Sequence, residues 1–267
     1  MNLTLSLAAS LEELQAHRRV DYVAARVRLH PDADSCVREF KGAFLIYDGA
    51  ESPVNRVMCL GLKEALLEED LPGIEEFYAV HGLKAMLDVC PLVEENMVYM
   101  LGKRGYTVYQ FDSVLVHEVS SFQLEIKEPP GIVIWPVNKN NYLTWLEVVS
   151  HGFSSAESDL MSMQSICEPN YHSRNSSAYL AYLDGKPAGG GVLYVRGHMA
   201  ELGGDATLPD FRRRGVQTAL IQHRMKIARK MGVRQMIFVS APGNSSERNA
   251  RRAGFEMAYS RTLLLQP

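Results

Sequence analysis

The sequence predicts a mixed α/β (α+β) fold with two domains, each a mostly antiparallel twisted sheet flanked by helices. Three observations lead to this prediction. The chain has 267 residues, more than one small core needs. Apolar residues recur at helical spacing in some segments and form strand-like runs in others. Near the middle, Glu128-Pro129-Pro130-Gly131 can continue neither a helix nor a central strand. We therefore expect one domain over residues 1–125 and a second over residues 126–267.

In the N-terminal half, each expected element rests on a local pattern. Leucine and valine recur at helical spacing over residues 7–23, and a helix there would expose Ser10, Glu12 and Glu13. The apolar run at residues 42–47 predicts a buried strand, because turn residues follow it directly. The next expected elements are a short helix over residues 74–81, a strand over 83–90, a helix over 94–103 and a strand over 106–119.

The C-terminal half has clearer turn signals. Asp184-Gly185-Lys186-Pro187 predicts a hairpin turn, and Gly189-Gly190-Gly191 predicts a bulge in the returning strand. A helix with one apolar face begins at Val216 and ends at Gly232. The other expected elements are strands over residues 132–137, 178–183, 198–208, 237–239 and 256–265, and helices over 142–149, 160–167 and 244–252.

Two segments share one layout at an offset of 149 residues. Residues 86–106 and 235–255 each read as a strand, a proline-containing loop, a helix and a glycine followed by an aromatic residue. The shared order predicts that the two domains are copies of one fold.

Composition excludes several classes of protein. Hydrophobic residues make up 46% of the chain and charged residues 22%, which are globular averages and exclude disorder. The net charge of −3 argues against nucleic acid or an anionic membrane as a partner. No long uncharged apolar run or signal peptide is evident, so we expect a cytoplasmic protein. The histidines and cysteines lack ligand spacing, so we expect no metal, and reduced, mostly buried thiols at Cys36, Cys59, Cys90 and Cys167.

The segment that follows the strand at residues 198–208 is strongly basic. From Phe211 to Arg234 inclusive there are eight Lys or Arg residues and no Asp or Glu. A helix N-terminus carries unpaired N–H groups and a partial positive charge, which together bind anions. Gly215 would let an anion approach the backbone, and the arginines before it would neutralise the charge. This segment therefore predicts a site for a phosphate or pyrophosphate.

The motif Arg212-x-x-Gly215-x-Gln217 resembles the Arg/Gln-x-x-Gly-x-Gly/Ala signature of the GNAT superfamily of N-acetyltransferases. The flanking strand and helix and the later Ala253-Gly254-Phe255 match the family's order, so the resemblance covers about residues 130–267. It implies two GNAT-like domains, the N-terminal one degenerate, and acetyl-CoA as co-substrate with its pyrophosphate in this loop. Gln217 departs from the family, which usually has Gly or Ala there. The resemblance places these residues against coenzyme A: Thr207, Leu208, Arg212, Arg213, Arg214, Gly215, Val216, Gln217, Thr218, Asn244 and Asn249.

The resemblance also suggests catalytic groups. Acyl transfer to an amine needs a proton acceptor, stabilisation of an oxyanion and departure of a thiolate. In the family, a backbone N–H of the bulged strand before the loop binds the oxyanion, and Gly203-Gly204 would suit a bulge here. Glu201 stands at the distance from the loop that the catalytic glutamate has in histone-type members, and Asp205 is the alternative base. Ala250 occupies the position of the family's usual tyrosine acid.

The N-terminal domain lacks such a loop. Residues 64–76 contain six acids and no cation, which would repel a pyrophosphate. The leading hypothesis is an N-acetyltransferase in which a primary amine of a small molecule or peptide attacks acetyl-CoA directly. One alternative is a catalytically silent acyl-CoA sensor, suggested by Ala250, and another is RNA binding through the basic helix. We expect no nucleic-acid or membrane partner, and a monomer or homodimer.

Overall fold

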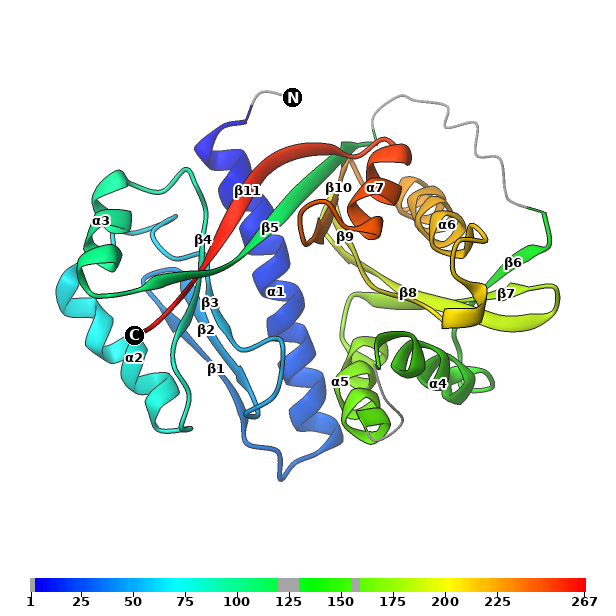
Figure 1. Cartoon of the computed structure of the whole chain (residues 1–267), viewed down its shortest axis with the longest axis horizontal. Coiled ribbons are helices and arrows are strands. Elements are labelled where there is room, and N and C mark those ends of the chain that lie inside the picture. The colour runs from blue at the N-terminus through cyan, green and yellow to red at the C-terminus, as the bar shows by residue number, and fades with distance from the viewer. Residues whose placement is uncertain (1–2, 120–129, 155–158) are drawn as a thin grey trace. The chain divides into compact units, whose positions relative to one another are not determined.

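The computed structural model describes residues 3–119, 130–154 and 159–267 (Figure 1). The chain forms two compact units: unit 1 contains Met1–Val114 and Met257–Pro267, and unit 2 contains Leu115–Glu256. The predicted boundary between residues 125 and 126 lies outside the described residues. The units differ from the predicted domains 1–125 and 126–267, because the C-terminal strand packs within unit 1.

Unit 1 is a sheet with the strand order β1-β2-β3-β4-β11-β5. Strands β3 and β4 are parallel, and the pairs β1–β2, β2–β3 and β4–β11 are antiparallel. Strand β5 continues from unit 1 into unit 2. The elements are α1 (Leu5–Leu29), β1 (Ser35–Phe40), β2 (Ala43–Asp48), β3 (Arg56–Met58), the 3-10 turn η1 (Glu68–Asp70), α2 (Leu71–Ala79), β4 (Met86–Val89), α3 (Glu95–Lys103), β5 (Thr107–Glu118) and β11 (Glu256–Leu265).

Helices cover both faces of this sheet, as strand β2 demonstrates. Leu45 and Tyr47 pack in a cluster with residues of α2 and α3, whereas Phe44 and Ile46 pack with residues of α1. Successive side chains of a strand point to opposite faces, so a strand covered on both faces is apolar throughout. This explains the continuous apolar run that predicted the strand.

The prediction that Glu12 lies on the exposed side of α1 is wrong. Glu12 is 1% exposed and accepts hydrogen bonds from Tyr259 Oη at 2.6 Å and Arg261 Nη1 at 2.9 Å. Both partners belong to β11, at the other end of the chain. Helical spacing reports which residues share a face, but it cannot reveal that a distant arginine compensates a buried carboxylate.

The strands of unit 2 follow the order β5-β10-β9-β8-β7-β6. Strands β9 and β10 are parallel, and the pairs β6–β7, β7–β8 and β8–β9 are antiparallel. The further elements are β6 (Ile132–Pro136), α4 (Tyr142–Phe153), α5 (Leu160–His172), β7 (Ser176–Leu183), β8 (Lys186–Arg196), β9 (Met199–Thr207), the 3-10 turn η3 (Pro209–Phe211), α6 (Val216–Lys230), β10 (Gln235–Ser240) and α7 (Ser245–Arg252).

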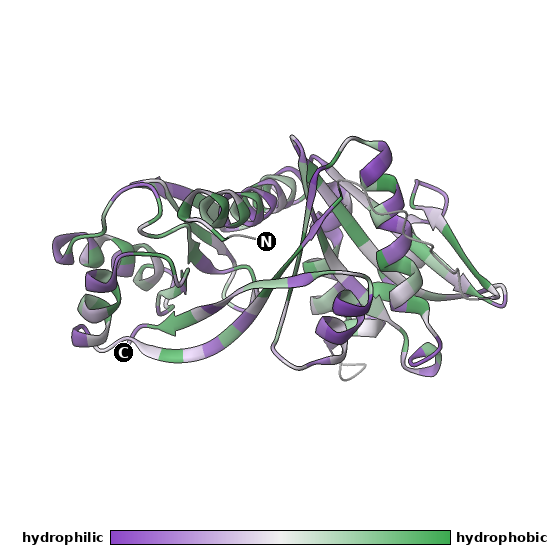
Figure 2. Cartoon of the chain, turned by 90° about the horizontal axis from the view of Figure 1, so that it is seen from above, coloured by the Kyte–Doolittle hydropathy of each residue, from purple (hydrophilic) through white to green (hydrophobic). Residues whose placement is uncertain are grey.

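The sheet of unit 2 lies between two helical layers, α6 and α7 on one face and α4 and α5 on the other (Figure 1). Strand β7 alternates between them, because Tyr179 and Ala181 pack in the cluster that contains α6, while Ala178 and Leu180 pack with α4 and α5. Hydrophilic and hydrophobic residues alternate along the helices, as expected when each helix buries one face (Figure 2).

The order of elements agrees with the predicted internal repeat. Strand β4, helix α3 and strand β5 begin at residues 86, 95 and 107, and β10, α7 and β11 begin at residues 235, 245 and 256. The offsets are 149, 150 and 149 residues. The predicted fold class, a mixed α/β fold with mostly antiparallel strands flanked by helices, is confirmed.

The four cysteines are free thiols, three of them buried and Cys36 half-buried, as predicted. Among the described residues, no helix has both the length and the apolar composition that crossing a bilayer requires.

Candidate functional site

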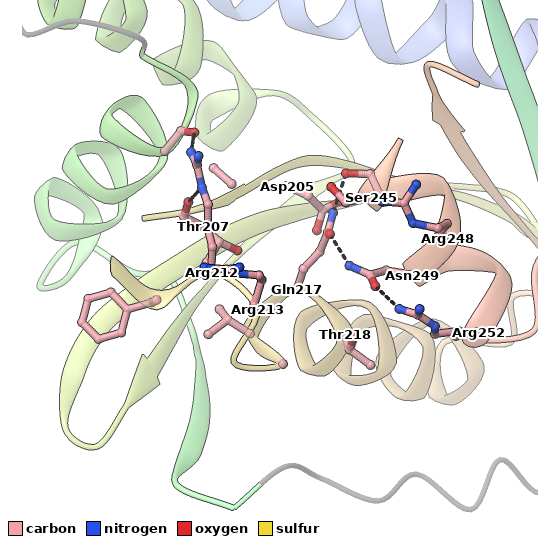
Figure 3. Close-up of a pocket in the computed structure, with 16 residues that line it drawn as sticks. Asp205, Thr207, Arg212, Arg213, Gln217, Thr218, Ser245, Arg248, Asn249 and Arg252 are labelled. Atoms are coloured by element: carbon pink, nitrogen blue, oxygen red, sulfur yellow. Dashed lines mark hydrogen bonds between the residues drawn. The ribbon is translucent and has the colours of Figure 1, made fainter. Parts of the chain in front are cut away.

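A cavity of about 700 Å³ opens beside the N-terminus of α6 in unit 2 (Figure 3). This volume is typical of sites that hold small molecules. The end of β9, the loop before α6, the first turn of α6 and helix α7 supply most of its wall. The lining residues are Gly152, Asp205, Ala206, Thr207, Phe211, Arg212, Arg213, Gly215, Val216, Gln217, Thr218, Ser245, Ser246, Arg248, Asn249 and Arg252.

A bulge in β9 shapes one wall of the cavity. The register between β8 and β9 shifts between Gly190, which pairs with Ala206, and Val192, which pairs with Gly203. Gly204, within the shifted segment, has a φ of +63°. The parallel pairing of β9 with β10 runs from Met199 to Leu202, so the bulged segment lies past the end of this pairing. The bulge predicted at Gly203-Gly204 is confirmed. The irregularity of β8 lies at the start of the predicted Gly189-Gly190-Gly191, where Ala181 of β7 pairs with Gly189 and Tyr182 with Pro187.

The N-terminus of α6 forms the second wall. Gly215 precedes the helix with a φ of +85°, a conformation that favours glycine. The first intrahelical bond runs from Ala219 N to Gly215 O at 3.0 Å, so the amides of residues 216–218 have no intrahelical acceptor. The first turn contains no acidic residue. The positive end of the helix dipole therefore meets the cavity without an opposing charge from its own helix.

The three arginines before Gly215 have different surroundings. Arg212 lines the cavity and donates from Nε to Thr207 O and from Nη2 to Gly152 O, both at 3.1 Å (Figure 3). It thus connects the end of β9 to α4. Arg213 also lines the cavity. Arg214 does not line it, and its side chain donates to Asp184 Oδ2 at 2.9 Å.

Gln217 joins α6 to α7. Its Nε2 donates to Ser246 Oγ at 2.9 Å, and its Oε1 accepts from Asn249 Nδ2 at 2.7 Å. Asn249 Oδ1 in turn accepts from Arg252 Nη1 at 3.1 Å (Figure 3). The side chain that departs from the expected glycine or alanine therefore connects two walls of the cavity.

The two candidate bases have different environments. Asp205 lines the cavity, and its Oδ1 pairs with Nη2 of Arg224, a fully buried residue of α6. Arg224 also donates from Nη1 to Val192 O at 2.8 Å, so it holds the bulge from two sides. Glu201 is 4% exposed and does not line the cavity. In the sheet it pairs with Tyr194 of β8 and Ile237 of β10.

The cavity is electropositive. Four arginines line it, and its one acidic residue, Asp205, is compensated by Arg224. Such a surface suits a ligand with several negative charges. Within the described ranges, no group of three or more His, Cys, Asp or Glu side chains is placed to hold a metal ion.

The structure brings most of the predicted site residues together. Those that line the cavity are Asp205, Thr207, Arg212, Arg213, Gly215, Val216, Gln217, Thr218 and Asn249. Those that do not are Glu201, Leu208, Arg214 and Asn244. Asn244 instead caps α7, because its Oδ1 accepts from Glu247 N at 2.8 Å.

Sequence reasoning missed part of the lining. Gly152 and Phe211 carry no pattern that points to a site. Arg248 and Arg252, however, stand four residues apart on a predicted helix directly after a strand. That spacing places both side chains on one helical face, and it could have identified them as a second basic group.

Comparison with family models matches residues 142–255 to the acetyltransferase (GNAT) family. A comparison with curated proteins gives no match. The family match covers β9, the loop before Gly215, and α6, and it ends at Phe255 beside β11.

Solved structures of low sequence identity share the fold. A GCN5-related N-acetyltransferase from Kribbella flavida has a TM-score of 0.67 at 15% identity, over 94% of this chain and 95% of its own. A tandem GNAT protein from the clavulanic acid biosynthesis pathway has a TM-score of 0.63 at 15% identity, over 98% of this chain and 94% of its own. A protein of unknown function from Staphylococcus epidermidis has a TM-score of 0.60 at 14% identity, over 90% and 96%. The chain therefore shares its fold with these proteins over nearly its whole length.

Proposed function

We propose, on the premise that residues 142–255 form a domain of the acetyltransferase (GNAT) family, that this chain transfers an acetyl group from acetyl-CoA to a primary amine. The family match indicates acyl transfer from an acyl-CoA to an amine. Beyond this, we propose that the donor is acetyl-CoA and that a primary amine of a small molecule or peptide attacks it directly.

The electropositive cavity at the start of α6 is the observation that carries the proposal. Pyrophosphate needs hydrogen-bond donors and positive charge, and the open amides after Gly215 together with Arg213 offer both. Arg212 supports the loop through its bonds to two carbonyls, so we assign it a positioning role. Arg214, which binds Asp184 outside the cavity, is assigned no phosphate contact.

The thioester would lie beside the bulged segment of β9. Backbone groups of residues 203–207 lie past the end of the pairing with β10, and Asp205, Ala206 and Thr207 line the cavity. In the proposed reaction the amine nitrogen attacks the thioester carbonyl carbon, and a backbone N–H of this segment binds the oxyanion. The C–S bond then breaks, the thiolate leaves and the nitrogen gives up its proton.

Glu201 is the proposed proton acceptor, through a water molecule. Asp205 is less suited to this role, because its charge is already bound by the Arg224 guanidinium. Cys167 does not line the cavity, and burial raises the pKa of its thiol to about 11, so that it stays protonated near neutral pH. This favours direct attack of the amine over an acyl-cysteine intermediate.

Calorimetric titration with acetyl-CoA, followed by a thiol-release assay on a panel of primary amines, tests the proposal. We expect binding, and turnover with at least one amine. Arg213→Gln should weaken acetyl-CoA binding about tenfold, as expected for loss of a charge-assisted contact. Arg214→Gln is the matched control and should bind as the wild type does. Absence of binding by the wild type would refute the proposal.

A silent acyl-CoA sensor is the second candidate function. Ala250, at the position of the family's usual tyrosine, is fully buried and offers no acid for the departing thiolate. A free thiol has a pKa of about 8.5, so a thiolate can leave without an acid near neutral pH. Binding of acetyl-CoA without turnover on any amine would favour the sensor.

A further inference from the structure

Helix α7 carries three arginines, of which two face the cavity. Arg248 and Arg252 line it and stand four residues apart, which places them on one helical face. Arg251 does not line it, and its Nε instead pairs with Glu247 Oε1 at 2.7 Å. Two arginines of the helix thus face the cavity, and the third is paired with a carboxylate of the same helix.

Within the described part of the chain, the hydrogen bonds of the Arg248 and Arg252 side chains go only to uncharged oxygen atoms. Arg248 Nη1 donates to the carbonyl oxygen of Gly243, and Arg252 Nη1 donates to Asn249 Oδ1 at 3.1 Å. Two like charges one helical turn apart repel each other. An anion bound between them would remove this repulsion.

The two basic groups of the cavity are held apart by neutral side chains. Arg212 and Arg213 lie before α6, whereas Arg248 and Arg252 lie on α7. Between them, Gln217 binds Ser246 and Asn249, and the same Asn249 orients Arg252 (Figure 3). A cavity with two separate basic groups suits a ligand that carries two separate anionic groups.

We propose that Arg248 and Arg252 form a second anion subsite that binds the 3′-phosphate of coenzyme A, apart from its pyrophosphate. This proposal rests on the proposed function, because it assigns the ligand's second phosphate group within the same cavity. The chemistry fits: a phosphate monoester accepts several hydrogen bonds, and arginine donates in the planar geometry that such a group prefers. The subsite would make the 3′-phosphate a determinant of affinity.

The test compares coenzyme A with 3′-dephospho-coenzyme A by calorimetric titration, which reads binding directly and needs no acceptor amine. We expect the wild type to bind coenzyme A at least about tenfold more tightly, as charge-assisted contacts imply. Arg248→Gln/Arg252→Gln should lose this preference to within about twofold. Its affinity for the dephospho compound should equal that of the wild type. Arg251→Gln, which removes the same charge from the same helix, is the matched control and should keep the full preference.

The outcomes separate this proposal from the function on which it rests. Equal affinity of the wild type for both compounds would overturn the subsite while leaving coenzyme A binding intact. A preference that survives in the double variant, or that is lost equally in Arg251→Gln, would also overturn it. If the wild type bound neither compound, the proposed function itself would fail. Melting curves of all variants verify that the exposed substitutions leave the fold unchanged.

Discussion

Asp205 and Arg224 connect the bulge of β9 to helix α6. Arg224 is fully buried, and it donates to Asp205 Oδ1 and to the carbonyl oxygens of Val192 and Leu220. A buried charge is costly unless a partner and hydrogen bonds compensate it. Because such pairs often add little net stability, we infer that this pair mainly specifies the shape of the bulge.

Replacing Arg224 with methionine should leave the Asp205 carboxylate buried without its cation. We expect the free energy of unfolding to fall by about 3–5 kcal/mol, as when one partner of a buried ion pair is removed. Urea denaturation measures the change. Arg224→Met/Asp205→Leu, which removes both charges, should recover part of the loss. A single variant as stable as the wild type would contradict the assigned role.

Glu201→Gln tests the proposed proton acceptor, because it preserves the shape of the side chain and removes its basicity. We expect kcat to fall about 10²- to 10⁴-fold, the usual contribution of a general base. The affinity for acetyl-CoA, measured by titration, should stay within about twofold of the wild type, since Glu201 lies outside the cavity lining. An unchanged kcat would assign Glu201 a structural role only.

At the scale of elements, local patterns predicted most of the helices and strands. The continuous run of β2, the repeat of β4-α3-β5 in β10-α7-β11 and the loop before Gly215 all follow from spacing and turn residues. The short strands β1 and β3 were not predicted, because their residues lack a complete alternating pattern. The sequence also did not predict that Arg214 binds Asp184 outside the cavity or that Asn244 caps α7. Each of these contacts depends on the tertiary structure around it.

Strand β11 supplies the central cation of a buried ion cluster in unit 1. Arg261 donates to Glu12 Oε2 at 2.9 Å and to Asp112 Oδ2 at 3.1 Å, and its Nε lies 3.4 Å from Asp88 Oδ2. Burial by itself raises the pKa of Asp88, yet Arg261 and Arg56 together hold it below the ordinary value. The cluster therefore contains a carboxylate that is ionised in the folded state and costly to protonate.

The lowered pKa of Asp88 predicts an acid-sensitive fold. Its stabilising contribution is fully present above the unfolded value of about 3.9, and it is lost as the pH falls through the lower folded value. Asp88→Asn should therefore be less stable than the wild type at pH 7 and should lose less stability between pH 5 and pH 2. Thermal melts across this range measure both effects. The exposed Asp32→Asn is the control and should follow the wild type; parallel curves for Asp88→Asn and the wild type would contradict the prediction.

At the scale of the whole molecule, the two compact units do not divide the chain at a single point. Residues 1–114 and 257–267 form one unit, whereas the sequence predicts a domain over residues 1–125. Residues 262–265 of β11 pair antiparallel with β4. The last strand of the chain is thus part of the core of the N-terminal unit, a topology that no local pattern specifies.

A fragment of residues 1–125 should consequently fail to fold. Without β11, strand β4 loses a partner, and Glu12, Asp88 and Asp112 lose the guanidinium that compensates them. Glu12 would then be buried without its cation, and Asp88 and Asp112 would keep only the compensation that Arg56 gives, which together would cost several kcal/mol. We expect the fragment to show no cooperative thermal transition by circular dichroism. The same fragment joined through a flexible Gly/Ser linker to residues 256–267 should regain one, because the linker returns the missing strand to the sheet. Cooperative unfolding of residues 1–125 alone would show that β11 is dispensable to this unit, and that the predicted domain 1–125 is sufficient.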